Sequence, residues 1–141
     1  MNYKNLKTRI KKNEGFSCCA YKDQLGNLTI GYGHLIKKNE KYLLNKKLKK
    51  SFFDNLFELD FLEAVKGYNK NFKKNKHTKK TQELIIEMIF QMGSKKVLKF
   101  KKMFKNINNN NKYLTALEMM NSLWYRQTPK RANDLIKNYL N

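Results

Sequence analysis

The chain has 141 residues, the usual size of one domain or of two lobes that share a core, and 40% of its residues are hydrophobic, enough to build a packed interior. Its 31 Lys and Arg residues against 11 Asp and Glu residues give a net charge of +20, which implies a polyanionic partner such as nucleic acid, anionic lipid or an anionic cell-wall polymer. No apolar run approaches the ~20 residues of a membrane span, so the sequence predicts no such span.

The first part of the chain predicts a short helix followed by a β-hairpin. One face of the helix carries three apolar or aromatic residues, Tyr3, Leu6 and Ile10. The helix should end near Glu14 and Gly15, because glycine favours the C-terminus of a helix. Strands are expected over 16–22 and 28–32, and the Asp, Gly and Asn residues of the intervening segment 23–27 suit a hairpin turn.

The rest of the chain predicts mainly helices. The Lys- and Asn-rich segment 37–50 should be partly irregular, and 69–80 should form a basic linker. Apolar residues at helical spacing predict helices over about 51–70, 81–92, 97–104 and 113–124. Gly93 should cap the second of these helices, and Thr128 followed by Pro129, the single proline, should begin a last helix.

Two adjacent cysteines, Cys18 and Cys19, lie on the first predicted strand. A disulfide between neighbours is strained and rare, so both are expected to be reduced thiols, one facing the core and one facing outward. A metal site would need further ligands nearby, and His34 is the only candidate. The sequence therefore predicts no disulfide, metal or other cofactor.

The hairpin places two carboxylates, Glu14 and Asp23, on either side of its first strand, with Thr29 on the second strand. Glycoside hydrolysis needs such a pair, because one carboxyl must hold a proton for the leaving oxygen while the other stays ionised. Each residue alone has an ordinary interpretation as a helix-end acid, a turn former or a strand residue. Gly31 and Gly33 follow, and they favour close backbone approach over phosphate binding.

These residues belong to a wider pattern, because the chain resembles the phage T4-type lysozymes, glycoside hydrolases that cut peptidoglycan. The similarity lies in separate blocks that follow the family's order along nearly the whole chain: 14–35, 90–93, 124–132 and, more weakly, 64–67. The resemblance implies an α+β, mostly helical, lysozyme-like domain. It would have a small β-hairpin lobe over about 14–50, a connecting helix over about 51–70, a helical lobe from 1–13 and 71–141, and a cleft between the lobes.

The resemblance also assigns roles to the carboxylates. Glu14 is similar to the general acid, Asp23 to its ionised partner, and Thr29 to the residue that helps Asp23 hold the attacking water. The position of Glu14 at a helix C-terminus fits independently, since the negative end of the helix dipole favours a protonated carboxyl. The family inverts the sugar anomer, so the two carboxyl groups should lie roughly 6.5–9.5 Å apart.

Further residues gain supporting roles from the same resemblance. His34 and Asp60 should form an ion pair between the small lobe and the connecting helix, and Arg131 should approach the catalytic glutamate. Three residues should contact the sugar chain, namely Leu35, Phe90 and Gln91. None of these roles follows from the residue types alone, since a histidine such as His34 is more often structural than catalytic.

The expected protein is thus a monomeric muramidase that cuts the β-1,4 bond between N-acetylmuramic acid and N-acetylglucosamine and serves host cell lysis. Its start lacks an apolar signal region, so it is expected in the host cytoplasm after synthesis and at the wall after release. Its charge should favour anionic wall polymers. Two alternatives stay open: a nucleic-acid-binding module, suggested by the charge and by 9 Phe, 8 Tyr and 1 Trp, and a non-catalytic wall binder on the same fold.

Overall fold

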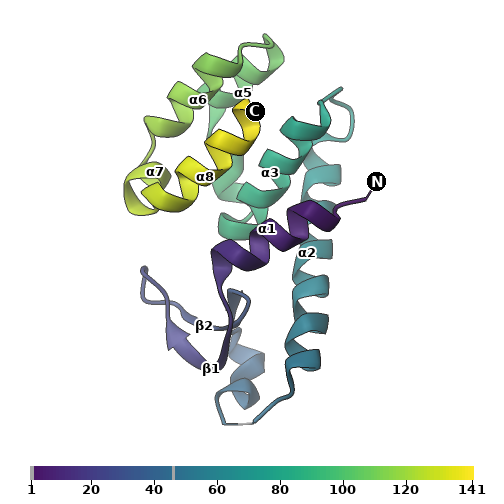
Figure 1. The fold of residues 1–141 in the computed structure, drawn as a ribbon, viewed down its shortest axis with the longest axis vertical. Coiled ribbons are helices and arrows are strands. Elements are labelled where there is room, and N and C mark those ends of the chain that lie inside the picture. Colours follow the sequence, from purple (N-terminus) through teal and green to yellow (C-terminus); the bar gives the residue numbers. More distant parts are fainter. Residues whose placement is uncertain (1, 46) are drawn as a thin grey trace. The chain divides into compact units, whose positions relative to one another are not determined.

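The computed structural model describes residues 2–45 and 47–141 and is shown in Figure 1. Met1, and Lys46 within the segment predicted to be partly irregular, lie outside the described residues. The described chain is mostly helical with a small antiparallel sheet, which confirms the predicted α+β class. It divides into two compact units, Met1–Glu63 and Ala64–Asn141. The division falls inside one long helix, and the predicted assignment of residues to lobes stays a prediction.

The first unit begins with helix α1 and a three-stranded sheet. Its elements are α1 (Lys4–Glu14), β1 (Ser17–Lys22), β2 (Leu28–Gly31), β3 (His34–Leu35), the 3₁₀ helix η1 (Lys38–Leu44) and the start of α2 (Lys50–Phe72). The helix and the hairpin were predicted, whereas β3 and η1 were not. The segment expected to be partly irregular therefore contains the 3₁₀ helix η1, in which Leu43 is buried.

The sheet has the order β1-β2-β3, with both pairs antiparallel. Between β1 and β2 the register pairs Ser17 with Gly31 and Tyr21 with Thr29. More residues of β1 than of β2 lie between these two pairs, so β1 forms a bulge there. A bulge bends a strand and redirects its side chains. Strand β3 follows Gly33 directly and turns back along β2, where it places His34 opposite Ile30.

The core of the first unit forms where the sheet meets the start of α2. Ile30, Leu43 and Phe53 are each at most 2% exposed and pack together. Phe53, Phe57 and Phe61 recur every four residues along α2 and are all buried, which is the stripe expected for one packed helical face. This stripe fixes α2 beneath the strands that carry the predicted site.

The second unit is helical throughout its described elements. It holds the end of α2, then α3 (Lys79–Met92), α4 (Ser94–Leu98), α5 (Lys101–Asn108), α6 (Lys112–Met120), α7 (Leu123–Gln127) and α8 (Pro129–Leu140). Helix α8 packs against α3, α6 and α7 (Figure 1). Gly67 allows α4 to approach α2, because a Cβ there would lie 2.5 Å from Ser94 Oγ.

Two predicted helices are divided in the structure. The apolar pattern over 97–104 spans both α4 and α5, and the pattern over 113–124 spans both α6 and α7. The second division coincides with Ser122, whose hydroxyl accepts a hydrogen bond from Tyr125 N at 3.1 Å and so begins α7. Thr128 precedes Pro129 as predicted, but its hydroxyl donates to Trp124 O instead of capping α8.

Candidate active site

Glu14 is the last residue of α1 and is half-buried. The chain leaves the helix through Gly15, which has a φ of 71°, a conformation that glycine adopts without a steric penalty. Gly33 lies against the Glu14 carboxylate, because a Cβ built at Gly33 would collide with Glu14 Oε2. The expectation that this glycine serves close approach is confirmed. The contact brings the end of α1 and the β2–β3 turn together around one carboxylate.

Asp23 occupies the β1–β2 turn and holds it closed. Its Oδ1 accepts hydrogen bonds from Leu25 N at 2.9 Å and Asn27 N at 2.8 Å, and its backbone N donates to Asn27 O. The Asn27 side-chain amide donates to Oδ2 at 3.4 Å. These bonds fix the orientation of the carboxylate. Asp23 therefore forms the turn, as its residue type suggests, and is also held rigidly, as a catalytic carboxylate needs to be.

Tyr21 lies on β1, between Glu14 and Asp23 in the chain, and the sequence analysis did not name it. Burial raises the pKa of its hydroxyl, and the negative charges of Glu14 and Asp23 raise this pKa further. Both carboxylates therefore lie within electrostatic range of one phenol. Tyr21 pairs with Thr29 across the sheet, and the hairpin register could have revealed this pairing. The Thr29 side chain is buried, and its hydroxyl donates to Asn27 O at 3.0 Å.

His34 is buried in a network that ties β3 to α2. Its Nδ1 lies 2.8 Å from Asp60 Oδ2, so the predicted pair is present. Its Nε2 lies 3.0 Å from Glu40 Oε1, a contact that was not predicted. Burial lowers the pKa of His34, but the hydrogen bonds and charges of Asp60 and Glu40 outweigh burial and leave this pKa raised. Burial likewise raises the pKa of Glu40, but Lys37 N and His34 leave it lowered.

These shifts predict a defined pH window for stability. The raised pKa of His34 stabilises the fold fully below the ordinary value of 6.5, and this contribution disappears as pH rises through the folded-state pKa. The lowered pKa of Glu40 stabilises the fold fully above 4.5, and this contribution disappears as pH falls through the folded-state pKa. We expect His34→Gln to cost about 1.5–3 kcal/mol within this window and less outside it, measured by urea unfolding at several pH values.

A double-mutant cycle and a surface pair provide the controls. Losses from His34→Gln and Asp60→Asn should not add, because either change breaks the same contact. Additive losses would show that the two residues are not coupled. The exposed pair of Lys7 and Glu58, with N and O 2.7 Å apart, is the matched control. Glu58→Gln should change the free energy of unfolding by about 1 kcal/mol or less and lack the same pH window.

The remaining predicted residues divide between the units. Leu35 lies on β3 and is 51% exposed, as a contact residue can be. Gln91 is held at both ends of its amide: its Oε1 accepts from Trp124 Nε1 at 3.0 Å, and its Nε2 donates to Thr128 Oγ1. Phe90 and Arg131 lie on α3 and α8 of the second unit. The sugar contacts of Leu35, Phe90 and Gln91 and the approach of Arg131 to Glu14 stay predictions.

The two cysteines are free thiols in the structure. The expectation that one faces the core is wrong, because both are exposed. The bulge between Ser17 and Tyr21 removes the alternation that a regular strand would impose. Among residues 2–45 and 47–141, no three His, Cys, Asp or Glu side chains are placed to hold a metal ion.

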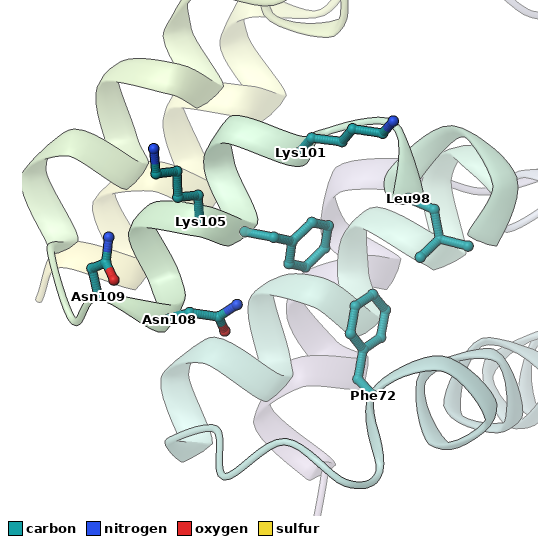
Figure 2. A pocket seen from close by; sticks show the side chains of 7 residues that line it. Phe72, Leu98, Lys101, Lys105, Asn108 and Asn109 are labelled. Atoms are coloured by element: carbon teal, nitrogen blue, oxygen red, sulfur yellow. The ribbon is translucent and has the colours of Figure 1, made fainter.

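A separate groove of about 580 Å³ opens on the second unit (Figure 2). Phe72 and Phe104 stack along it with their ring centroids 4.9 Å apart. The other lining residues are basic, amide or aliphatic: Leu98, Lys101, Lys105, Asn108 and Asn109. No carboxylate lines the groove, so it lacks the acid and the base of glycoside hydrolysis. The two predicted catalytic carboxylates, Glu14 and Asp23, lie in the first unit. None of the helices in the described ranges is long and apolar enough to cross a membrane.

The fold is consistent with a lysozyme-type glycoside hydrolase, and comparison with known proteins shows this class. The sequence pattern of the phage lysozyme family matches residues 11–138, and the chain belongs to this family. Two proteins of Dictyostelium discoideum are similar to it, "Probable T4-type lysozyme 2" at 36% identity and "Probable T4-type lysozyme 1" at 34%. Each comparison covers 94% of this chain and 91% of the relative. The resemblance is confirmed, and the chain is an enzyme of the lysozyme class.

Proposed function

We propose that the enzyme cuts the β-1,4 bond between N-acetylmuramic acid and N-acetylglucosamine in peptidoglycan, that it inverts the anomer, and that this reaction lyses a bacterial host cell. The observation that carries the proposal is the placement of two carboxyls around the hairpin: Glu14 lies against Gly33, and hydrogen bonds from Leu25 N and Asn27 N fix Asp23. It supports a single site in which one carboxyl acts as the acid and the other guides water. Membership of the phage lysozyme family supports the same substrate class.

The proposed mechanism gives each residue one task. Glu14 donates a proton to the leaving glycosidic oxygen. Asp23, fixed by the turn, accepts a hydrogen bond from the attacking water. The Thr29 hydroxyl uses its own hydrogen for Asn27 O, so its lone pairs remain to accept a second hydrogen bond from that water. A water held by two acceptors has a lone pair free to attack the anomeric carbon. Asp23 takes up the proton that the water releases.

The first product anomer tests this mechanism. A β-linked chain cut with inversion gives an α-anomer, so proton NMR during the first minutes of digestion should show α-anomeric reducing ends before mutarotation. The reducing ends should be N-acetylmuramic acid. An initial β-anomer would establish retention and contradict water attack between separated carboxyls. N-acetylglucosamine reducing ends would instead reassign the bond.

We also propose that the charge of +20 speeds the encounter of the enzyme with anionic wall polymers and does not act on the bond-breaking step. The basic residues are spread along the chain and are not clustered at Glu14 and Asp23. Screening shortens the reach of this field to about 10 Å at 0.1 M salt. Lysis of whole walls should therefore fall steeply as salt is added, whereas cleavage of a short uncharged oligosaccharide should change little. Parallel losses on both substrates would show that salt affects the site or the fold, and would contradict the steering role.

A further inference from the structure

The pair of Cys18 and Cys19 is a feature that the proposed mechanism does not use. Both thiols are exposed, and their sulfur atoms lie 3.9 Å apart. The hydrogen bond with Cys18 and that residue's charge raise the pKa of Cys19, while the charge of Lys47 opposes them. The two sulfur atoms are therefore neighbours on the surface of the hairpin, and the chain has no third cysteine with which either could form a disulfide.

The regular pairing of β1 with β2 is interrupted around the two cysteines. The paired positions on either side are Ser17 with Gly31 and Tyr21 with Thr29, so the segment between Ser17 and Tyr21 carries the irregularity. A local turn holds it instead: Ser17 Oγ accepts from Cys19 N at 3.2 Å and donates to Cys19 O at 2.6 Å. The backbone between the two flanking pairs therefore has more freedom than a regular ladder allows.

We propose that Cys18 and Cys19 are a reversible modification site, at which a small disulfide oxidant such as oxidised glutathione closes a disulfide between the neighbouring residues. One thiolate attacks the oxidant's disulfide, forms a mixed disulfide and releases one glutathione thiolate. The second cysteine, as a thiolate, then attacks the cysteine sulfur of the mixed disulfide and releases the second glutathione. The protein loses two electrons and two protons, and the oxidant gains the electrons as it becomes two thiols.

The geometry makes this bond labile. Adjacent Cα atoms lie about 3.8 Å apart across a trans peptide. This is shorter than the separation that an unstrained disulfide prefers, and a strained disulfide is more easily reduced. The bulge supplies the backbone freedom that closure needs, while the remaining strain keeps the bond reversible. These properties are typical of a redox-responsive pair and not of a structural disulfide.

Closure also affects the site, an inference that rests on the proposed function. The pair lies on β1, between Glu14 and Asp23 in the chain, and Ala20 separates it from Tyr21. Closing the disulfide should disturb the hydrogen bonds between Ser17 and Cys19 and shift the backbone of β1, which leads to Asp23. Because a shift of about 1 Å in a catalytic group can cost 10²-fold in rate, the oxidised enzyme should lyse walls up to about 10²-fold more slowly.

Mass spectrometry of the native protein tests the modification itself. The reduced chain is equilibrated in a series of reduced and oxidised glutathione mixtures, quenched with acid and labelled with N-ethylmaleimide. The expected product is a monomer that has lost two hydrogens and takes up no label, and dithiothreitol should restore two labelled thiols. Cys18→Ser and Cys19→Ser, each with one thiol, should instead gain one glutathione. A wild-type chain that carries only mixed disulfides, or keeps both thiols labelled throughout, would overturn the proposal.

The lysis assay tests the consequence separately. Oxidised wild-type enzyme should lose activity and regain it with dithiothreitol, while the Cys18→Ser/Cys19→Ser double variant should be indifferent to the oxidant. Equal activity of the closed and reduced forms would overturn the link to the site and leave the modification standing. A reduced enzyme that fails to lyse walls would count against the proposed function, and the mass measurement would still decide the disulfide.

Discussion

Glu14→Gln is expected to abolish lysis of bacterial walls while leaving the fold intact. The amide keeps the size of the carboxyl and its place against Gly33, but it cannot donate the acid proton. Loss of general acid catalysis should lower the rate of turbidity clearing by about 10²–10⁴-fold or more. Binding to walls should persist, since the chain keeps 31 Lys and Arg residues.

The control makes the same chemical change elsewhere in the first unit. Glu58 lies on α2 with its side chain 52% exposed, so Glu58→Gln removes one carboxylate without touching the hairpin. This variant should clear walls at the wild-type rate, and both variants should give the wild-type circular dichroism spectrum. If Glu14→Gln retains most of its activity, the assignment of Glu14 as the acid is wrong. If this variant unfolds, its loss of activity says nothing about proton transfer, and Glu14→Asp must be compared instead.

Gly33→Ala should cause the second large loss, by a different route. Its φ of 72° disfavours any side chain, and the new methyl would occupy the position of the Glu14 carboxylate. The carboxylate is the end of a flexible side chain, so it should swing aside instead of unfolding the turn. We therefore expect activity to fall by about 10²-fold, whereas stability should fall by only about 1–3 kcal/mol.

Gly26→Ala separates the backbone strain from the displaced carboxylate. Gly26 has a φ of 82°, and a methyl group there would meet no atom within 4 Å. Both variants should show a similar drop in thermal stability, but only Gly33→Ala should lose most of its lytic rate. Equal activity in the two variants would mean that the close approach at Gly33 does not position the acid.

The sequence predicted those features that local chemistry determines. Helix ends at Gly15, Gly93 and Pro129 agree with the structure because glycine and proline restrict the backbone directly. The hairpin turn at Asp23 was predictable for the same reason. The spacing of apolar residues did not reveal the break between α6 and α7 at Ser122, because the apolar pattern continues across it.

Other parts of the site depend on contacts that no local pattern encodes. The interaction of Glu40 with His34 joins a 3₁₀ helix to a two-residue strand, both too short to show periodicity. The outward position of both cysteines depends on a bulge, which alternation along the strand cannot anticipate. The collision that Gly33 avoids with Glu14 requires the end of α1 and the turn after β2 to be folded first.

The compact grouping of acid, turn carboxylate and threonine between Glu14 and Thr29 also bears on how such enzymes diverge. All three proposed catalytic groups lie within residues 14–29, so a transfer of this one segment would carry them together. Substitutions in the helices from Ala64 onward leave these three residues in place, so in the proposed function they would change how the enzyme meets the wall and not the groups that react.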